Sequence, residues 1–210
     1  FRKEGHHRLR GGDIEAQAYF TEICCVLKRG IGDFPAAVGT DALLLPTGRV
    51  PRIGVSWSTT NPVYGAGRTI PISGWTPLLS GLPFPVEWVN LQYGNVDREL
   101  AQLKQSNGVD IEHTCGADFV TDLGGLMSRI GGVDAVVSID NSTVFFAGLL
   151  RKPTLMMLTA IPHWIWGAGD IRSVWIPSIE MFRKSQEESW ESVLAAIRNR
   201  LALAAKKVSA

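Results

Sequence analysis

The sequence predicts an α/β domain, a Rossmann-like parallel sheet with helices on both faces. Short, mostly apolar strand candidates alternate along the chain with segments of helical periodicity. Strands separated by helices in this way form right-handed βαβ units, which make the strands parallel and cover both faces of the sheet. With 210 residues, 45% of them hydrophobic, the chain can bury a core of this kind.

The predicted strands are apolar runs bounded by polar or turn residues. They are residues 53–57, 86–91, 109–112, 135–139 and 154–158. The predicted helices have apolar positions at helical spacing. They are residues 13–29, 97–106, 121–130, 143–150 and 189–205, and Asp122 is expected to cap the third of them.

A stretch rich in glycine and proline, residues 32–51, separates the first helix from the first strand. We therefore assign residues 1–51 to the remnant of an N-terminal half with its linker, and residues 52–210 to the Rossmann-like domain. Because the chain begins at Phe1, we expect it to be part of a longer protein.

Charge and cysteine content argue against several classes of protein. Lys and Arg number 21 against 20 Asp and Glu, so no net charge attracts nucleic acid or an anionic membrane. No apolar run approaches the roughly 18 residues of a membrane span. The three cysteines are an odd number, and Cys24 and Cys25 are adjacent, which does not indicate a disulfide framework. These features favour a cytoplasmic protein.

Four small polar residues, Asp140, Asn141, Ser142 and Thr143, interrupt the apolar run 136–158. At the end of a buried strand, such residues form a turn into a helix, with Asn141 or Ser142 as the cap. The first amides of that helix and the positive end of its dipole suit a phosphate or diphosphate. The alternative is that Asn141 and Ser142 only cap a buried helix.

An ordered series of motifs over most of residues 52–200 resembles a known family. The series is RIGVSW, Arg68 ahead of TIPISGWTPLL, WVNLQYG, DLGGLMSRIGGVDAVVSIDNSTVFFAGLLRKP, PHWIWG and SVWIPSIEMFR. It is similar to the C-terminal nucleotide-sugar domain of GT-B glycosyltransferases. The likeness is greatest to bacterial tetratricopeptide-linked proteins similar to O-linked N-acetylglucosamine transferases and, more distantly, to heptosyltransferases.

The resemblance implies that residues 52–210 bind a nucleotide diphosphate sugar at the carboxyl ends of the strands. Asn141, Ser142 and Thr143 would hold the diphosphate, and Asp140 would lie near the sugar or ribose of the donor.

The two preceding strands would supply the rest of the donor site. By the same resemblance, Ser56 and Trp57 would border the crevice, and Asn90, Leu91 and Gln92 would lie near the base. The alternative for Gln92 is that it only ends its strand.

Arg68 matches the position at which this family carries a basic residue. The resemblance implies a catalytic role, in which the cation neutralises the leaving diphosphate. From composition alone, an arginine between Gly67 and Thr69 is a solvated surface residue.

Two positions depart from the family's pattern. Phe145 stands where a histidine is usual and cannot donate a hydrogen bond, and Ile165 stands where a basic residue is usual. They favour an alternative function, a degenerate, non-catalytic binding or assembly module of a tetratricopeptide repeat protein. A dinucleotide oxidoreductase is disfavoured, because no G-x-G-x-x-G follows the first strand.

The leading hypothesis is a fragment of an inverting hexosyl- or heptosyltransferase that uses a nucleotide diphosphate sugar. We expect no metal and no further cofactor. His163 is an isolated histidine and lacks the partner spacing of a zinc site. We also expect no nucleic-acid partner. A missing N-terminal half, with or without helical repeats, would bind the protein or glycan acceptor and supply the general base.

Overall fold

One six-stranded parallel sheet organises the part of the chain that the structure describes. The computed structural model describes residues 43–62, 65–116, 118–167, 171–173 and 175–206, all within the compact unit Ala36–Ala210. The strands are β1 (Arg52–Ser56), β2 (Glu87–Asn90), β3 (Ile111–Glu112), β4 (Ala135–Ile139), β5 (Thr154–Leu158) and β6 (Ile179–Arg183). Their order across the sheet is β3-β2-β1-β4-β5-β6, and neighbouring strands are parallel.

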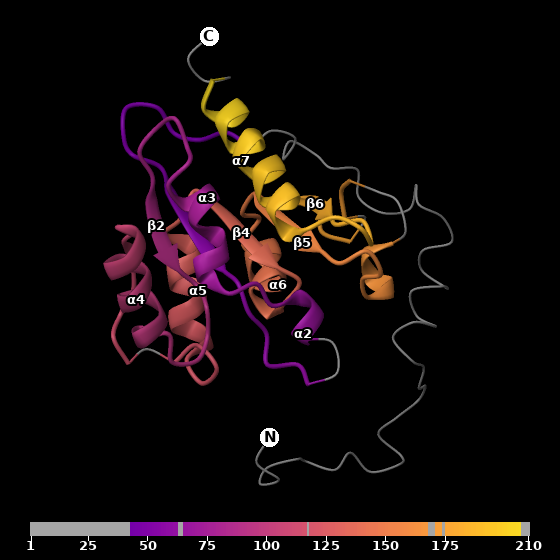
Figure 1. Ribbon diagram of the computed structural model, residues 1–210, viewed down its shortest axis with the longest axis horizontal. Helices are drawn as coiled ribbons and strands as arrows, with labels where there is room; N and C mark the ends of the chain where they lie inside the picture. Colours follow the sequence, from indigo (N-terminus) through magenta and orange to yellow (C-terminus); the bar gives the residue numbers. More distant parts are fainter. Residues whose placement is uncertain (1–42, 63–64, 117, 168–170, 174, 207–210) are drawn as a thin grey trace, which may run out of the picture. The chain divides into compact units, whose positions relative to one another are not determined.

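Helices connect the strands and cover the sheet. They are α2 (Gly65–Arg68), α3 (Thr76–Leu79), α4 (Asp97–Asn107), α5 (Leu123–Gly131), α6 (Ser142–Leu149) and α7 (Trp190–Lys206), with 3-10 turns η3 (Ile72–Trp75) and η4 (Trp164–Trp166). Helices α5 and α6 lie side by side, and α7 packs along β6 (Figure 1).

Both faces of the sheet are buried, because successive side chains of a strand point to opposite sides. Val137 of β4 packs in one apolar cluster with Leu100 of α4 and Ile197 of α7. Its neighbour Val136 packs in a second cluster with Ile130 of α5. Every residue of β4 and β5 is buried, as expected for central parallel strands.

The α/β fold class predicted from the sequence is confirmed. Strands β4 and β5 have the predicted bounds, and β1, β2 and β3 are shorter or shifted by one or two residues. The helices predicted after residue 96 are present to within two residues at each end. Asp122 caps α5 as predicted, accepting a hydrogen bond of 2.7 Å from the amide of Gly125. The helix predicted at residues 13–29 lies outside the described residues.

Strand β6 and the short helices between β1 and β2 were not predicted. The sequence of β6, IEMFR, has charged residues at Glu180 and Arg183, and only Ile179 and Met181 are buried. The division of the chain at residue 51 stays a prediction. Leu43 and Leu45, on the N-terminal side of that division, are buried in the same apolar cluster as β1.

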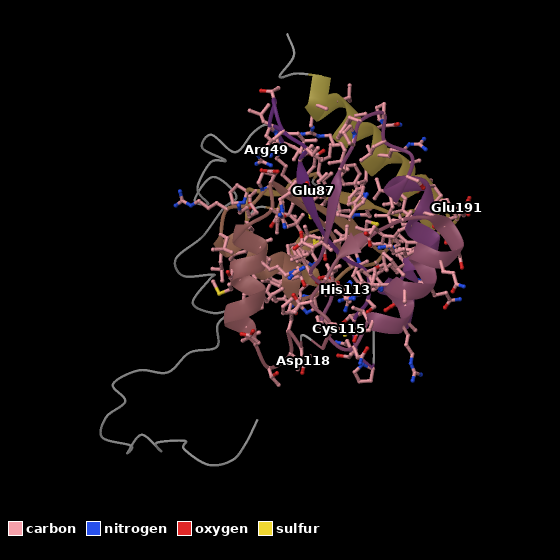
Figure 2. All side chains as sticks on the ribbon, turned by 90° about the vertical axis from the view of Figure 1, so that its left-hand side faces the viewer. Arg49, Glu87, His113, Cys115, Asp118 and Glu191 are labelled. Carbon is pink, nitrogen blue, oxygen red and sulfur yellow. The ribbon has the colours of Figure 1, made fainter. Side chains whose placement is uncertain are left out.

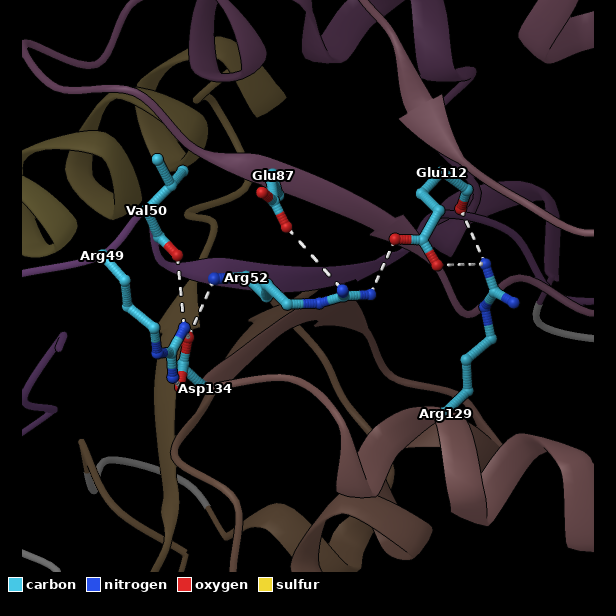
Figure 3. Close-up of polar contacts among 7 residues, drawn as sticks. All are labelled: Arg49, Val50, Arg52, Glu87, Glu112, Arg129 and Asp134. Atoms are coloured by element: carbon cyan, nitrogen blue, oxygen red, sulfur yellow. Dashed lines mark hydrogen bonds and ion pairs between the residues drawn. The ribbon is translucent and has the colours of Figure 1, made fainter.

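An ion-pair network connects the starts of β1, β2 and β4 with Glu112, the last residue of β3 (Figure 3). Asp134, just before β4, accepts hydrogen bonds from Nη1 of Arg49 at 2.9 Å and from the amide of Arg52 at 2.8 Å. The Arg52 side chain extends toward Glu87 and Glu112, with its Nη2 2.7 Å from Oε2 of Glu112. In Figure 2, Arg49 and Glu87 lie above His113 and Cys115. The network therefore ties the segments at the starts of β1, β2 and β4 to the end of β3.

Acid should weaken the contribution of Asp134 to stability. Burial raises the pKa of Asp134, but the hydrogen bonds from Arg49 and Arg52 outweigh this effect and hold the pKa below its ordinary value. A lowered pKa in the folded state gives stability that is complete above the unfolded pKa of about 3.9 and is lost as the pH falls through the folded value. We expect Asp134→Asn to lower the free energy of unfolding at pH 7, and the difference from wild type to shrink below pH ~4 in urea titrations.

The control for this experiment is Asp110→Asn. The Asp110 side chain is 70% exposed and pairs with Lys104, so its removal should change stability little at any pH. A difference between wild type and Asp134→Asn that stays constant from pH 7 to pH 2 would contradict the assignment.

Gly54 of β1 is a second position that the fold constrains. A Cβ at this residue would overlap the side chain of Leu91, which is fully buried behind it. We expect Gly54→Ala to cost about 2 kcal/mol, because overpacking a filled core typically costs 1–3 kcal/mol. Gly131→Ala is the matched control: its Cβ meets open space and alanine favours the helix, so stability should stay the same or rise. Equal urea midpoints for Gly54→Ala and wild type would refute the close approach.

Candidate functional site

The candidate site lies at the carboxyl edge of the sheet, where the strand order changes direction. From β1 the chain proceeds outward to β2 and β3, and it then returns to β4 on the other side of β1 and continues to β5 and β6. In open α/β sheets, ligands bind in the crevice at such a switch point. The loops that follow β1 and β4 carry most of the residues that the sequence singled out.

Gln92 joins the carboxyl ends of β1 and β2. Its Oε1 accepts three hydrogen bonds, from Oγ of Ser56 at 3.0 Å, from the amide of Trp57 at 2.9 Å and from the amide of Ser58 at 2.8 Å. The amide of Gln92 donates to Oδ1 of Asn90 at 2.9 Å. One side-chain oxygen thus holds the start of the loop after β1.

Asn141 joins the carboxyl ends of β1 and β4 and caps α6. Its Oδ1 accepts a hydrogen bond from the amide of Thr143 at 3.1 Å. Its Nδ2 donates to Oγ of Ser56 at 2.8 Å and to the carbonyl oxygen of Ser58 at 3.1 Å. The capping role considered from the sequence is therefore present, and it also ties the two loops of the switch point together.

Most of the predicted donor-binding residues are buried in this network or beside it. Residues at most 7% exposed are Ser56, Trp57, Asn90, Leu91, Gln92, Asp140, Asn141 and Thr143. Ser142, the first residue of α6, is exposed. The geometry gives the buried residues a positioning role and leaves Ser142 facing solvent at the helix start. Their direct contact with a donor stays a prediction.

Arg68 and Asp140 form an ion pair across the switch point. Nη1 of Arg68, in the last turn of α2, lies 2.9 Å from Oδ2 of Asp140, and the two side chains are 15% and 7% exposed. The indole Nε1 of Trp166 donates to Oδ1 of Asp140 at 2.9 Å. The interpretation of Arg68 as a solvated surface residue was therefore wrong. Partial burial strengthens the electrostatic interaction and fixes the guanidinium in place.

A cleft of about 450 Å³ opens beside Arg68. It is lined by residues of α2 and of the segments that follow β5 and β6, namely Gly67, Arg68, Thr159, Ala160, Ile161, Lys184 and Gln186. Its volume is within the range of small-molecule sites. The sequence analysis missed Lys184 and the segment 159–161, because β6 was not predicted and the loop after β5 carries no recognised motif.

Phe145 packs against the tryptophan that holds Asp140. The ring centroids of Phe145 and Trp166 are 5.3 Å apart, and Phe145 remains 38% exposed while Trp166 is buried. The phenylalanine thus gives Trp166 an apolar contact at the place where the resembling family has a hydrogen-bonding histidine. Of the two tryptophans in the PHWIWG motif, Trp166 is buried in the core, whereas Trp164 is 58% exposed.

The described residues contain no group of three His, Cys, Asp or Glu side chains that could hold a metal ion. None of the described helices has the length and apolar character needed to cross a membrane.

Comparisons with known proteins address the fold. No protein-family model matches the chain. Protein FlbA of Caulobacter vibrioides is 31% identical over 163 residues, which make up 76% of this chain and 26% of FlbA. The structure of E. coli heptosyltransferase WaaC with ADP matches 77% of this chain and 46% of that protein, with a TM-score of 0.51 and 16% identity. The same enzyme with ADP-2-deoxy-2-fluoro heptose gives a TM-score of 0.50 over 77% of this chain.

The chain has a glycosyltransferase-like fold. It spans about a quarter of FlbA and less than half of the heptosyltransferase chain. At 16% identity, the heptosyltransferase comparison supports the α/β architecture and leaves the choice of donor and acceptor open.

Removing the acceptor oxygen of Gln92 should destabilise the domain. In Gln92→Met, the Ser56 hydroxyl and the amides of Trp57 and Ser58 lose their common acceptor, and each unsatisfied buried group costs about 1–3 kcal/mol. We expect a total loss of about 2–4 kcal/mol in urea unfolding, because water can solvate part of the loop. Gln102→Met on the exposed side of α4 is the control and should leave stability within about 0.5 kcal/mol. Equal effects of the two substitutions would mean that Gln92 does not hold the loop.

Proposed function

We propose that this chain is the donor-binding domain of a glycosyltransferase that transfers a sugar from a nucleotide diphosphate sugar to an acceptor. The observation that carries the proposal is Arg68, fixed by Asp140 at the wall of a cleft on the carboxyl edge of the sheet. The likeness to a heptosyltransferase fold in complexes with ADP and a fluorinated ADP-heptose supports the same ligand class.

The proposed chemistry needs a fixed cation at this position. In glycosyl transfer, the bond between the anomeric carbon and a diphosphate oxygen breaks, and negative charge develops on the leaving diphosphate. A preorganised guanidinium stabilises that charge without reorganising during the reaction. Arg68 meets this requirement, because its ion pair with Asp140 already sets its orientation.

The start of α6 would contribute to the same binding. The backbone of Ser142 stands at the positive end of the helix dipole, where a phosphate is favoured. Asn141, Thr143, Ser56 and Gln92 would act by holding this turn and the loop after β1 in place. In the proposal Asp140 has two tasks, orienting Arg68 and lying near the sugar or ribose of the donor.

The remaining parts of the proposed reaction belong to a longer protein. The chain spans 46% of the matched heptosyltransferase, so we propose that a further domain binds the protein or glycan acceptor and supplies the general base. The same proposal has four further parts, which rest on the motif series. The reaction inverts the anomeric configuration, needs no metal and takes place in the cytoplasm. The longer protein carries tetratricopeptide repeats, as relatives of O-linked N-acetylglucosamine transferases do.

A non-catalytic binding module is the second candidate. It is favoured by Phe145, whose ring packs on Trp166 and provides no polar group toward a donor. Such a module would keep the fold and the Arg68–Asp140 pair and would bind a nucleotide without transferring sugar.

Nucleotide binding tests the proposal. We expect one of UDP, GDP and ADP to bind the 210-residue chain in isothermal titration, and Arg68→Ala to weaken that binding by at least 10-fold. Ser142→Pro should also weaken it, because proline removes the amide at the first helical position. Proline is tolerated there, since Asn141 before it is already extended, with φ −145° and ψ −175°.

Arg98→Ala is the matched control, since Arg98 is an exposed arginine on α4, away from the cleft. It should bind nucleotide as wild type does. No heat and no saturation-transfer signal with any of the three nucleotides at millimolar concentration would overturn the proposal for this chain.

A further inference from the structure

We propose that Lys184 is a second phosphate-binding cation of the cleft, and that Lys184 and Arg68 together bind the diphosphate of a nucleoside diphosphate. The inference rests on the proposed function and assigns a residue that the motif series does not include. It starts from the described lining of the cleft, in which Arg68 and Lys184 are the charged residues and no carboxylate is present.

The segment after β6 holds Lys184 at the cleft. The backbone amide of Lys184 donates to the carbonyl oxygen of Leu158 at 2.8 Å, which continues the pairing of β6 with β5 by one residue. Ser185 and Glu188 then form a reciprocal cap: the amide of Ser185 donates to Oε2 of Glu188 at 2.8 Å, and the amide of Glu188 donates to Oγ of Ser185 at 3.2 Å. The backbone around Lys184 is therefore fixed on both sides.

The ammonium group of Lys184 forms no ion pair within 4.0 Å among the described residues, although its charge, after the hydrogen bonds with Ser185, helps to lower the pKa of the nearby Glu188 carboxyl. Its Nζ donates to the carbonyl oxygen of Glu188 at 2.9 Å and lies 5.7 Å from the centroid of the Trp190 ring. An ammonium has three N–H donors, so the bond to Glu188 leaves two that can be directed to phosphate oxygens.

Lys184 adds a positive charge to the lining of the cleft, and this charge favours the binding of an anion. Asp140 lies 2.9 Å from Nη1 of Arg68 and partly compensates its charge, so a second cation strengthens the attraction of the cleft for an anion. Lys184 supplies a second positive charge among the described lining residues, which the Glu188 carboxylate outside that lining offsets only in part. A diphosphate has oxygens on two phosphorus atoms and can contact both cations at once, whereas a monophosphate offers a single phosphorus centre. The arrangement therefore predicts a preference for nucleoside diphosphates over monophosphates.

Titrations with matched nucleotides test the assignment. The 210-residue chain is titrated with UDP, GDP and ADP, with the corresponding monophosphates and with inorganic pyrophosphate, in wild-type, K184Q, K184R and K104Q forms. We expect K184Q to weaken binding of the preferred diphosphate about 10-fold and of its monophosphate about 3-fold or less, and K184R to retain most of the affinity. Lys104 pairs with Asp110 on the surface and is 62% exposed, so K104Q should bind as wild type does. Weaker pyrophosphate binding than diphosphate binding would show that the nucleoside is recognised as well.

The outcomes separate this inference from the proposed function. Unchanged diphosphate affinity in a folded K184Q variant overturns the role of Lys184 and leaves the donor-binding proposal standing. Equal losses for the diphosphate and the monophosphate, or equal losses in K184Q and K104Q, also overturn the two-cation site. Absence of binding of every nucleotide to wild type overturns both proposals. Thermal melts of each variant show whether it is folded.

Discussion

Two buried amide side chains, those of Gln92 and Asn141, hold the carboxyl edge of the sheet together. Between them they engage the ends of β1, β2 and β4 and the first turn of α6. A buried amide that forms all its hydrogen bonds specifies one arrangement, because any shift leaves a donor or acceptor unpaired. The positions of the loop after β1 and of the turn after β4 are both set in this way.

The same edge carries a partly buried carboxylate, that of Asp140, which would be unfavourable without partners. Trp166 supplies a hydrogen bond to one of its oxygens, and Arg68 supplies a positive charge at the other. Phe145 packs on the Trp166 ring and so helps to hold the indole that donates to Asp140. The aromatic residues Phe145 and Trp166 thus position the Asp140 carboxylate, and that carboxylate orients the Arg68 guanidinium.

The features that could be predicted from the sequence are those that depend on patterns of, or interactions between, residues close together in the chain. Strands β4 and β5 were predicted with correct bounds because full burial makes them uninterrupted apolar runs, and the caps Asp122 and Asn141 were predicted because capping is a local interaction. Strand β6 was missed because the charged residues Glu180 and Arg183 leave it without an uninterrupted apolar run. The contact between Arg68 and Asp140 joins distant segments, and nothing in the local sequence of either residue indicates it. The cleft beside them depends on β6 and was missed with it.

Both outer edges of the sheet are already engaged within the described part of the chain. Strand β3 has two residues, and the carbonyl oxygen of Glu112 accepts a hydrogen bond from Arg129 at 3.0 Å. Along β6, the amide of Met181 donates to the carbonyl oxygen of Ile171, and the amide of Ser173 donates to that of Ile179. Open edges invite pairing with strands of other molecules, and engaged edges resist it. Another protein that docks on this domain would then have to recognise its helices and loops, since the sheet offers little free backbone for strand addition.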